Sequence, residues 1–391
     1  MQRLLPDSLS HLPAPSAEAA AHSARLGALI RQAIDDAGGW ISFAHFMDLA
    51  LHVPGLGYYS AGMHKFGSAG DFVTAPELGY LFAGTLARQA AQILRSAGLT
   101  EIIECGAGSG RLARDLLRAL AELDSLPQRY CILETSADLR ARQKMLLDRE
   151  APQIASRVVW LDALPPAIDA LVIANEVLDA MPVHVVSARN DGIDEIGVVA
   201  SADRFAWQSR GAAGAVLDAA RLLPIAAGCT TEIGLAAAAF TRTLAESIQH
   251  GVATFIDYGF PSREYYHPQR SGGTLMCHYR HHAHADPLCL VGLQDITAHV
   301  DFSAIAGAAV DGGCELLGYT GQAQFLINCG ITDLLSATPP ENTEKYLPLA
   351  AEAQKLMSPA EMGELFKVIA YGRGIDFTLA GFSRGDRGYS L

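Results

Sequence analysis

A run of glycines near residue 106 has the residue types and the position to bind a cofactor. Residues 102–105 are largely apolar, Gly106, Gly108 and Gly110 follow at G-x-G-x-G spacing, and 110–123 has the pattern of an amphipathic helix. A strand, a glycine turn and a helix in succession direct backbone N–H groups toward a ligand at the helix N-terminus. Glycine is needed because a Cβ would block the turn and the approach of the ligand. The expected cofactor contacts in this run are Glu104, Gly106, Ala107, Gly108 and Gly110.

The spacing of these glycines distinguishes between two classes of cofactor. The dinucleotide fingerprint G-x-G-x-x-G/A requires a small residue where this chain has Arg111. The observed spacing therefore favours S-adenosylmethionine, with S-adenosylhomocysteine as product, over NAD. Two alternatives stay open at this point: a strand-to-helix turn that binds no ligand, and an NAD-dependent oxidoreductase, against which Arg111 argues.

Acidic residues end the next two predicted strands. Glu134 follows the apolar stretch 130–133, and a carboxylate there can accept hydrogen bonds from both ribose hydroxyls of a cofactor. Asp162 follows the stretch 157–161, where its carboxylate would meet an adenine amino group, although a turn-forming or helix-capping Asp is an equal alternative. Glu134, Asp162 and the adjacent Ala163 are expected to contact the cofactor.

Two further apolar stretches end in polar residues that could handle a substrate. Asn175 and Glu176 follow one stretch, with Asp179 three residues on, and Asp257 follows another. Carboxyl ends of parallel strands face the ligand, and Glu176 and Asp179 would share a face if their turn is helical. Carboxylates can bind a guanidinium in bidentate fashion and help its proton leave. Glu176, Asp179 and Asp257 are therefore catalytic candidates, with Asn175 and Glu176 also at the cofactor edge; a solvated acidic turn is the alternative.

Strand-like and helix-like stretches alternate along the middle of the chain. Such alternation predicts an α/β fold, a doubly wound and mostly parallel sheet with a Rossmann-like core, which would position all of these residues at one edge. The expected strands are 102–103, 130–133, 158–161, 170–174 and 252–256, and the expected helices are 25–37, 78–97, 110–123, 137–149, 232–249 and 359–371.

The same patterns predict the organisation of the chain. We expect a flexible tail (1–24), an N-terminal helical and loop cap over the cofactor (25–97), the core (98–335) with a β-rich insertion at about 184–230, and a C-terminal helical segment packed on the core (336–391). Residues 265–300 are expected to form a long histidine-rich loop.

Composition narrows the classes of partner. A formal charge of -13 without a basic block argues against nucleic acid or an anionic membrane, and favours a basic protein substrate. No stretch is apolar enough to cross a membrane, and the beginning of the chain does not resemble a signal or transit peptide. Seven cysteines without C-x-x-C spacing predict neither disulfides nor zinc, so we expect a cytoplasmic location.

The histidines at 278–284 invite a metal interpretation. His278, His281, His282 and His284 lie close together in sequence, and imidazoles bind zinc or iron. Their spacing matches no helical metal motif, and the segment is flanked by Gly and Pro. We therefore predict a polar loop bordering the cleft, and no metal site.

Several separated segments together resemble the MidA-type family, which includes a mitochondrial complex I assembly-factor methyltransferase. The similarity extends over about residues 25–375. The segments that carry it are the glycine run, Ile41–Phe43, Pro54–Tyr59, Gly70–Glu77, Ala174–Val183, Phe255–Gly259 and Asp295–Phe302.

The resemblance implies a class I methyltransferase core that uses S-adenosylmethionine, and arginine methylation of a protein such as a respiratory complex I subunit. It places the cofactor on Gly106, Gly108 and Gly110, its ribose on Glu134, and the active-site edge at Asn175 and Glu176. It also implies that the segment from Asp71 to Glu77 folds over the cofactor. On that basis Thr74 and Pro76 are expected to bind the cofactor, and Glu77 is a fourth catalytic candidate. An assembly factor that binds the cofactor without turnover is the alternative.

Overall fold

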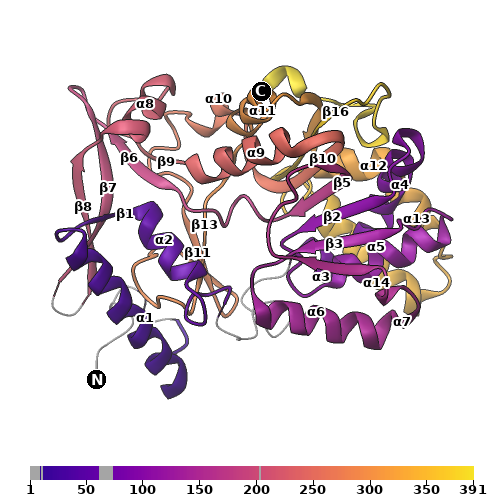
Figure 1. The fold of residues 1–391 in the computed structure, drawn as a ribbon, viewed down its shortest axis with the longest axis horizontal. Helices are drawn as coiled ribbons and strands as arrows, with labels where there is room; N and C mark the ends of the chain where they lie inside the picture. Colours follow the sequence, from indigo (N-terminus) through magenta and orange to yellow (C-terminus); the bar gives the residue numbers. More distant parts are fainter. Residues whose placement is uncertain (1–8, 10–11, 61–73, 202–203) are drawn as a thin grey trace. The chain divides into compact units, whose positions relative to one another are not determined.

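The computed structural model of this chain describes residues 9, 12–60, 74–201 and 204–391 (Figure 1). The chain forms two compact units. The core unit comprises 73–177, 239–261 and 302–391, and the accessory unit comprises 1–72, 178–238 and 262–301. Of the residues 25–97, the described residues 25–60 fall in the accessory unit and 74–97 in the core unit.

The core unit contains a mixed sheet in which the order of strands is β15-β16-β10-β5-β2-β3-β4. From β10 to β4 each neighbouring pair is parallel, and β16 is antiparallel to both β10 and β15. This order confirms the predicted α/β class with a mostly parallel central sheet. The strands are β2 (Glu101–Cys105), β3 (Arg129–Leu133), β4 (Val158–Leu161), β5 (Ile168–Asn175), β10 (Ile248–Phe260), β15 (Glu315–Gly321) and β16 (Phe366–Arg373).

Helices cover this sheet and bury its central strands. The side chains of residues 171–174 in β5 are at most 1% exposed, as expected for a strand covered on both faces. The helices of the core unit are α3 (Ala75–Leu78), α4 (Tyr80–Ala97), α5 (Arg111–Glu122), α6 (Ala137–Glu150), α7 (Pro152–Ala155), α11 (Phe302–Asp311), α12 (Gln322–Asn328), α13 (Ile331–Ser336) and α14 (Thr343–Met357), with short 3₁₀ turns at Ala380–Phe382 and Gly388–Ser390.

Local signals fix where the helices nearest the predicted site begin and end. Ser136 precedes α6, and its hydroxyl accepts a hydrogen bond from the Leu139 N–H at 3.4 Å. α4 ends at Gly98, which adopts the left-handed conformation (φ 66°) that favours glycine after a helix. α5 starts directly after Gly110, so the glycine run ends at its N-terminus.

The accessory unit contains two small antiparallel sheets and includes the predicted β-rich insertion. One sheet has the order β1-β7-β6-β9, and β8 also pairs with β7. The other sheet has the order β12-β11-β13. The elements are α1 (Ala17–Asp36), β1 (Ile41–Ser42), α2 (Phe43–His52), β6 (His184–Ala188), β7 (Ile193–Ala200), β8 (Phe205–Gly211), α8 (Gly214–Leu222), β9 (Thr230–Ile233), α10 (Ser262–Tyr265), β11 (Met276–Tyr279), β12 (His282–His284), β13 (Asp295–Thr297) and β14 (Val300–Asp301). Helix α9 (Leu235–Ser247) begins in this unit and ends in the core unit.

Two predicted elements were wrong, and a third begins three residues later than predicted. The predicted helix 359–371 is replaced by β16, whose buried run from Phe366 to Tyr371 lies between two strands; a short apolar run does not distinguish a buried strand from a helix. The predicted loop 265–300 contains the sheet β12-β11-β13, in which Cys277 pairs with His284 and Ile296. The predicted helix 232–249 begins only at Leu235, because Glu232 belongs to β9.

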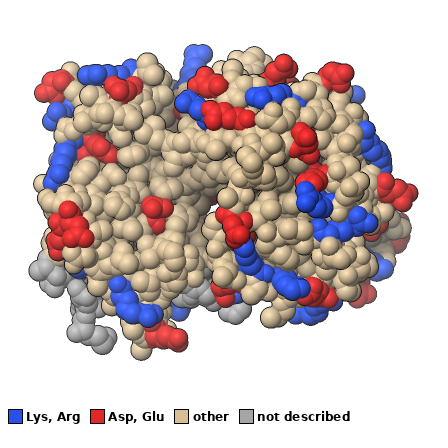
Figure 2. Space-filling model, in the orientation of Figure 1, with Lys and Arg blue, Asp and Glu red and all other residues tan. Residues whose placement is uncertain are grey.

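The first helix also begins earlier than predicted. α1 starts at Ala17 rather than at residue 25, because the Ser16 hydroxyl accepts a hydrogen bond from the Ala19 N–H and caps the helix. Within the described residues, no helix is both long and apolar enough to cross a membrane. On the face shown in Figure 2, lysine and arginine side chains lie among acidic ones rather than in a separate basic patch.

Candidate functional site

The register of the core sheet brings the predicted residues to one edge. Cys105 pairs with Leu133 on one side and with Ala174 on the other, and Asn175 pairs with Ile256. Gly106, Glu134 and Asn175 therefore lie at or just beyond the carboxyl ends of β2, β3 and β5, and Asp257 lies within β10, one residue after its last pair with β5. This is the edge at which open α/β sheets bind ligands.

The glycine run has a backbone that few other residues could adopt. Gly106, Gly108 and Gly110 have φ values of 67°, 51° and 84°, in the left-handed region where a Cβ is unfavourable. A Cβ on Gly106 would also lie 2.9 Å from Cγ2 of Val177, although Gly106 itself is exposed. The Gly106 N–H donates to the Leu133 carbonyl at 3.1 Å, which ties the start of the run to β3.

Glu176 occupies a strained position at the same edge. Its φ of 54° is unusual for a residue with a Cβ, and such strain concentrates at functional sites. The Glu176 N–H donates to the Ile256 carbonyl at 2.9 Å, and Asn175 Nδ2 donates to Glu176 Oε1 at 3.0 Å. The Asp257 carboxylate accepts from the backbone N–H groups of Val177 (3.2 Å) and Tyr258 (3.0 Å). Asp257 therefore braces the turn that presents Glu176.

Glu104 is a buried acid directly before the glycine run. Its side chain is 2% exposed, and the Tyr130 hydroxyl donates to Glu104 Oε2 at 2.7 Å. Burial raises the pKa of Glu104 to about 7, and the Tyr130 hydrogen bond opposes only part of that rise. The carboxyl group therefore changes its charge near neutral pH.

Glu134 lies at the end of β3 and is also buried, with 8% exposed. Its Oε1 accepts from the Ser136 N–H at 2.9 Å, and its Oε2 accepts from Gln143 Nε2 at 3.2 Å. Burial raises the pKa of Glu134, while these hydrogen bonds lower it. No sequence pattern pointed to Gln143, because a glutamine in a polar helix is expected to face solvent.

Glu77 binds the glycine run itself. The Ser109 hydroxyl donates to Glu77 Oε1, and Arg111 Nη1 lies 3.2 Å from Glu77 Oε2. The Glu77 side chain is 7% exposed, whereas the Arg111 side chain is 34% exposed, so the carboxylate is buried and the guanidinium still reaches solvent. In the sequence Arg111 was only an argument against a dinucleotide cofactor. In the structure it forms an ion pair with Glu77, a predicted catalytic residue.

Thr74 and Pro76, also predicted to contact the cofactor, lie directly before Glu77 at the start of α3. The Thr74 carbonyl accepts from the Glu77 N–H at 2.9 Å, and Pro76 is buried at the start of α3. Residues 71–73 of the predicted covering segment lie outside the described residues.

Asp162 and Ala163 are both solvent-exposed. The Asp162 side chain is 92% exposed, and its carboxylate lies 2.8 Å from Arg140 Nη2. Arg140 also donates to the carbonyls of Glu134 and Leu161, so it links the ends of β3 and β4. Sequence reasoning missed this arginine as well.

Asp179 falls in the accessory unit, whereas the other predicted site residues fall in the core unit. It is 4% exposed, and its carbonyl accepts from the Ala298 N–H at 3.0 Å. The turn from Glu176 to Asp179 is not helical, so the condition for their sharing a helical face is not met.

The histidines at 278–284 lie on and between two strands. His278 is in β11, while His282 and His284 are in β12. Among the residues that the structure describes, no group of three or more His, Cys, Asp or Glu side chains is arranged to hold a metal ion.

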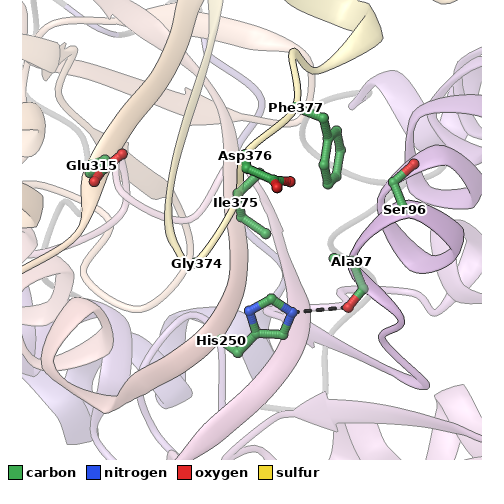
Figure 3. Close-up of a pocket in the computed structure, with 8 residues that line it drawn as sticks. All are labelled: Ser96, Ala97, His250, Glu315, Gly374, Ile375, Asp376 and Phe377. Carbon is green, nitrogen blue, oxygen red and sulfur yellow. Dashed lines mark hydrogen bonds between the residues drawn. The ribbon is translucent and has the colours of Figure 1, made fainter.

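A separate hollow of the core unit lies at the opposite end of the strands (Figure 3). His250, near the start of β10, is directed at Ala97 at the end of α4, and its Nε2 lies 2.9 Å from the Ala97 carbonyl oxygen. The remaining lining residues are Ser96, Glu315, Gly374, Ile375, Asp376 and Phe377. None of them belongs to the predicted cofactor site.

The parallel sheet, the G-x-G-x-G turn and the acids at its carboxyl edge define a class I S-adenosylmethionine-dependent methyltransferase. The model of a family of S-adenosyl-L-methionine-dependent methyltransferases, Methyltransf_28, matches residues 85–320, and the chain belongs to that family.

Solved structures and curated relatives agree with this assignment. A Burkholderia thailandensis protein solved with bound S-adenosyl-homocysteine is 52% identical, has a TM-score of 0.94, and the match covers 97% of this chain and 100% of the other. A native structure from the same organism is also 52% identical, with a TM-score of 0.92 and the same coverage. The Drosophila melanogaster protein arginine methyltransferase NDUFAF7 homolog is 27% identical over 86% of this chain and 82% of its own length. The Mus musculus protein arginine methyltransferase NDUFAF7 is 28% identical over 85% and 81%. These matches confirm the MidA-type resemblance and S-adenosylmethionine as the cofactor.

The structure of the core unit also has the features that this cofactor needs. The exposed Gly106 leaves room at the edge of the sheet, and the buried carboxylates of Glu104 and Glu134 lie at the same edge. The buried Oδ1 atom of Asn175 has no hydrogen-bond partner in the described part of the chain, and such an atom is costly unless a ligand or water satisfies it.

Gly106→Ala should weaken S-adenosylhomocysteine binding about tenfold or more, because the new Cβ meets Val177 and narrows the ligand side of the turn. Gly98→Ala is the matched control, since Gly98 has nearly the same φ (66°) with nothing within 4 Å of the added Cβ. Calorimetric titration of both variants checks this. Equal affinities in the two variants would show that the cofactor does not lie against Gly106.

Glu104→Gln should change how stability depends on pH. The folded-state pKa of about 7 lies above the ordinary 4.5, so the native protein binds the extra proton and wild-type stability falls as pH rises between these values. The free energy of unfolding of Glu104→Gln relative to wild type should therefore increase by about 3 kcal/mol from pH 4.5 to pH 8. Urea unfolding across this range tests it, with the exposed Glu361→Gln as control. A difference between Glu104→Gln and wild type that does not vary with pH would contradict the prediction.

Proposed function

We propose that this methyltransferase transfers the methyl group to an arginine side chain of a protein partner. The curated relatives that match most of this chain carry the name protein arginine methyltransferase, at 26–28% identity. The observation in this chain that carries the proposal is the Glu176 carboxylate, presented on a strained and braced turn beside the glycine run.

Glu176 has the chemistry that a guanidinium substrate needs. A carboxylate binds the planar guanidinium through two parallel hydrogen bonds, and it can accept the proton that the methylated nitrogen releases. The φ of 54° and the Asn175 hydrogen bond limit where this carboxylate can point. Glu176 would thus orient the substrate nitrogen, while Asp257 would hold the turn in place through the N–H groups of Val177 and Tyr258.

The edge of the sheet supplies the cofactor contacts. The backbone of residues 106–110 would hold the cofactor, Glu134 would accept its ribose hydroxyls, and the unpartnered Oδ1 of Asn175 would accept one of its donors. When bound, S-adenosylmethionine supplies a methyl group on a positively charged sulfur. Glu77, bound to Ser109 and Arg111, would fix the shape of the glycine run rather than contact substrate.

The partner should be a protein with an accessible, positively charged segment. The chain has a formal charge of -13, which favours association with basic partners. The MidA-type family includes a mitochondrial complex I assembly factor, so a subunit of a respiratory complex is the first partner to test.

Incubation with methyl-labelled S-adenosylmethionine and a cell lysate tests the proposal. We expect label in protein and, after complete acid hydrolysis, in methylated arginine. Label only in other amino acids or in small molecules would overturn the arginine assignment. Cofactor binding without any labelled product would instead favour an assembly factor that does not turn over.

Glu176→Gln should lower kcat about 10²- to 10⁴-fold, because the amide cannot accept the proton and binds the guanidinium weakly. Its affinity for S-adenosylhomocysteine should stay within a few-fold of wild type. The exposed Glu341→Gln is the matched control and should keep wild-type activity. An active Glu176→Gln variant would remove this residue from the reaction.

A further inference from the structure

Gln143 occupies a position in α6 where an apolar side chain is expected. Leu139, Gln143 and Leu147 form the buried stripe of this helix at intervals of four residues, and Gln143 is 0% exposed. A buried amide is unfavourable unless each polar atom finds a partner. The contacts of this side chain are therefore informative.

The Gln143 amide connects three neighbouring strand ends of the core unit. Its Nε2 donates to the Gly108 carbonyl at 3.0 Å and to Glu134 Oε2 at 3.2 Å, and its Oε1 accepts from Trp160 Nε1 at 2.8 Å. The indole N–H is only a donor and the carbonyl is only an acceptor, so the partners fix which way the amide faces. Carbon atoms of Gln143 also lie 3.2–3.3 Å from where a Cβ on Gly110 would be.

We propose that Gln143 is a positioning residue that orients the Glu134 carboxylate toward the ribose of S-adenosylmethionine and holds the glycine run beside it. The proposal rests on the proposed role of Glu134 in binding the ribose. Ser136 engages Oε1 and Gln143 engages Oε2, which fixes the plane of the carboxylate. A carboxylate can accept about four hydrogen bonds, and the Thr135 N–H is a third donor to Glu134, so about one acceptor site remains for a ribose hydroxyl.

The hydrogen bond also affects the charge of Glu134. Burial raises the pKa of this carboxyl, and the Gln143 amide lowers it. Loss of the amide would therefore favour the protonated form, which has one acceptor fewer.

Calorimetric titration with S-adenosylhomocysteine and its 2′-deoxy analogue tests the proposal without relying on turnover. Wild type should bind the analogue about tenfold more weakly, because a hydrogen bond to a charged group is lost. In Gln143→Met the analogue should bind only about twofold more weakly than S-adenosylhomocysteine. The affinity for S-adenosylhomocysteine itself should fall about tenfold. Gln322→Met is the matched control: Gln322 is also 0% exposed in the core unit and donates to the Leu356 carbonyl. It should lower stability and leave the ratio at the wild-type value.

Two results would overturn the proposal and differ in meaning. If wild type binds S-adenosylhomocysteine but does not discriminate against the analogue, the ribose role of Glu134 fails and the Gln143 proposal fails with it. If wild type discriminates and Gln143→Met keeps the same ratio, Gln143 alone is excluded.

Trp160→Phe provides a second variant should Gln143→Met not fold. Trp160 is only partly buried, and this change removes the indole donor while Gln143 stays in place. The amide then loses the partner that sets its direction, so discrimination should fall about threefold. An unchanged ratio in Trp160→Phe would contradict a positioning role for the amide.

Discussion

The parallel pairing of β2, β5 and β10 is the constraint on which the rest of the site depends. These strands pair in register, with Cys105 beside Ala174 and Asn175 beside Ile256, so the residues that follow, Gly106, Glu176 and Asp257, come to the same edge. Because β5 is buried on both faces, its register cannot slip without moving apolar side chains out of the core. The turns at this edge must therefore be sharp, and both Gly106 and Glu176 adopt positive φ there. The strain at Glu176 is held by hydrogen bonds to Ile256 and Asn175 and by the Asp257 brace.

Burying acids at this edge is costly, and each buried carboxylate has its own donors. Glu104 accepts from the Tyr130 hydroxyl, Glu134 from Ser136 and Gln143, and Asp257 from two backbone N–H groups. Such donors fix each carboxylate before the ligand binds, which lowers the entropic cost of binding. A row of fixed acids would favour a cofactor that bears a positive sulfur.

Sequence reasoning could identify the alternating core and the cofactor class because both depend on local patterns. Strand ends, glycine spacing and the following acids are read directly from the chain. It failed where contacts between distant segments determine the secondary structure. The run from Phe366 to Tyr371 is a strand only because two strands flank it, and β11 pairs with β13 across the loop between them. The roles of Gln143 and Arg111 depend on partners 9 to 35 residues away in sequence, so no local pattern indicates them. The division that separates Asp179 from Glu176 likewise has no counterpart in the sequence.

We propose that S-adenosylmethionine binds at the carboxyl edge of β2, β3, β5 and β10. A crystal structure of this chain with S-adenosylhomocysteine tests it most directly. We expect ligand density against the backbone of residues 106–110, with the ribose hydroxyls within hydrogen-bond distance of the Glu134 carboxylate. Density elsewhere in the chain, or ribose hydroxyls held by another carboxylate, would show that this edge is not the cofactor site.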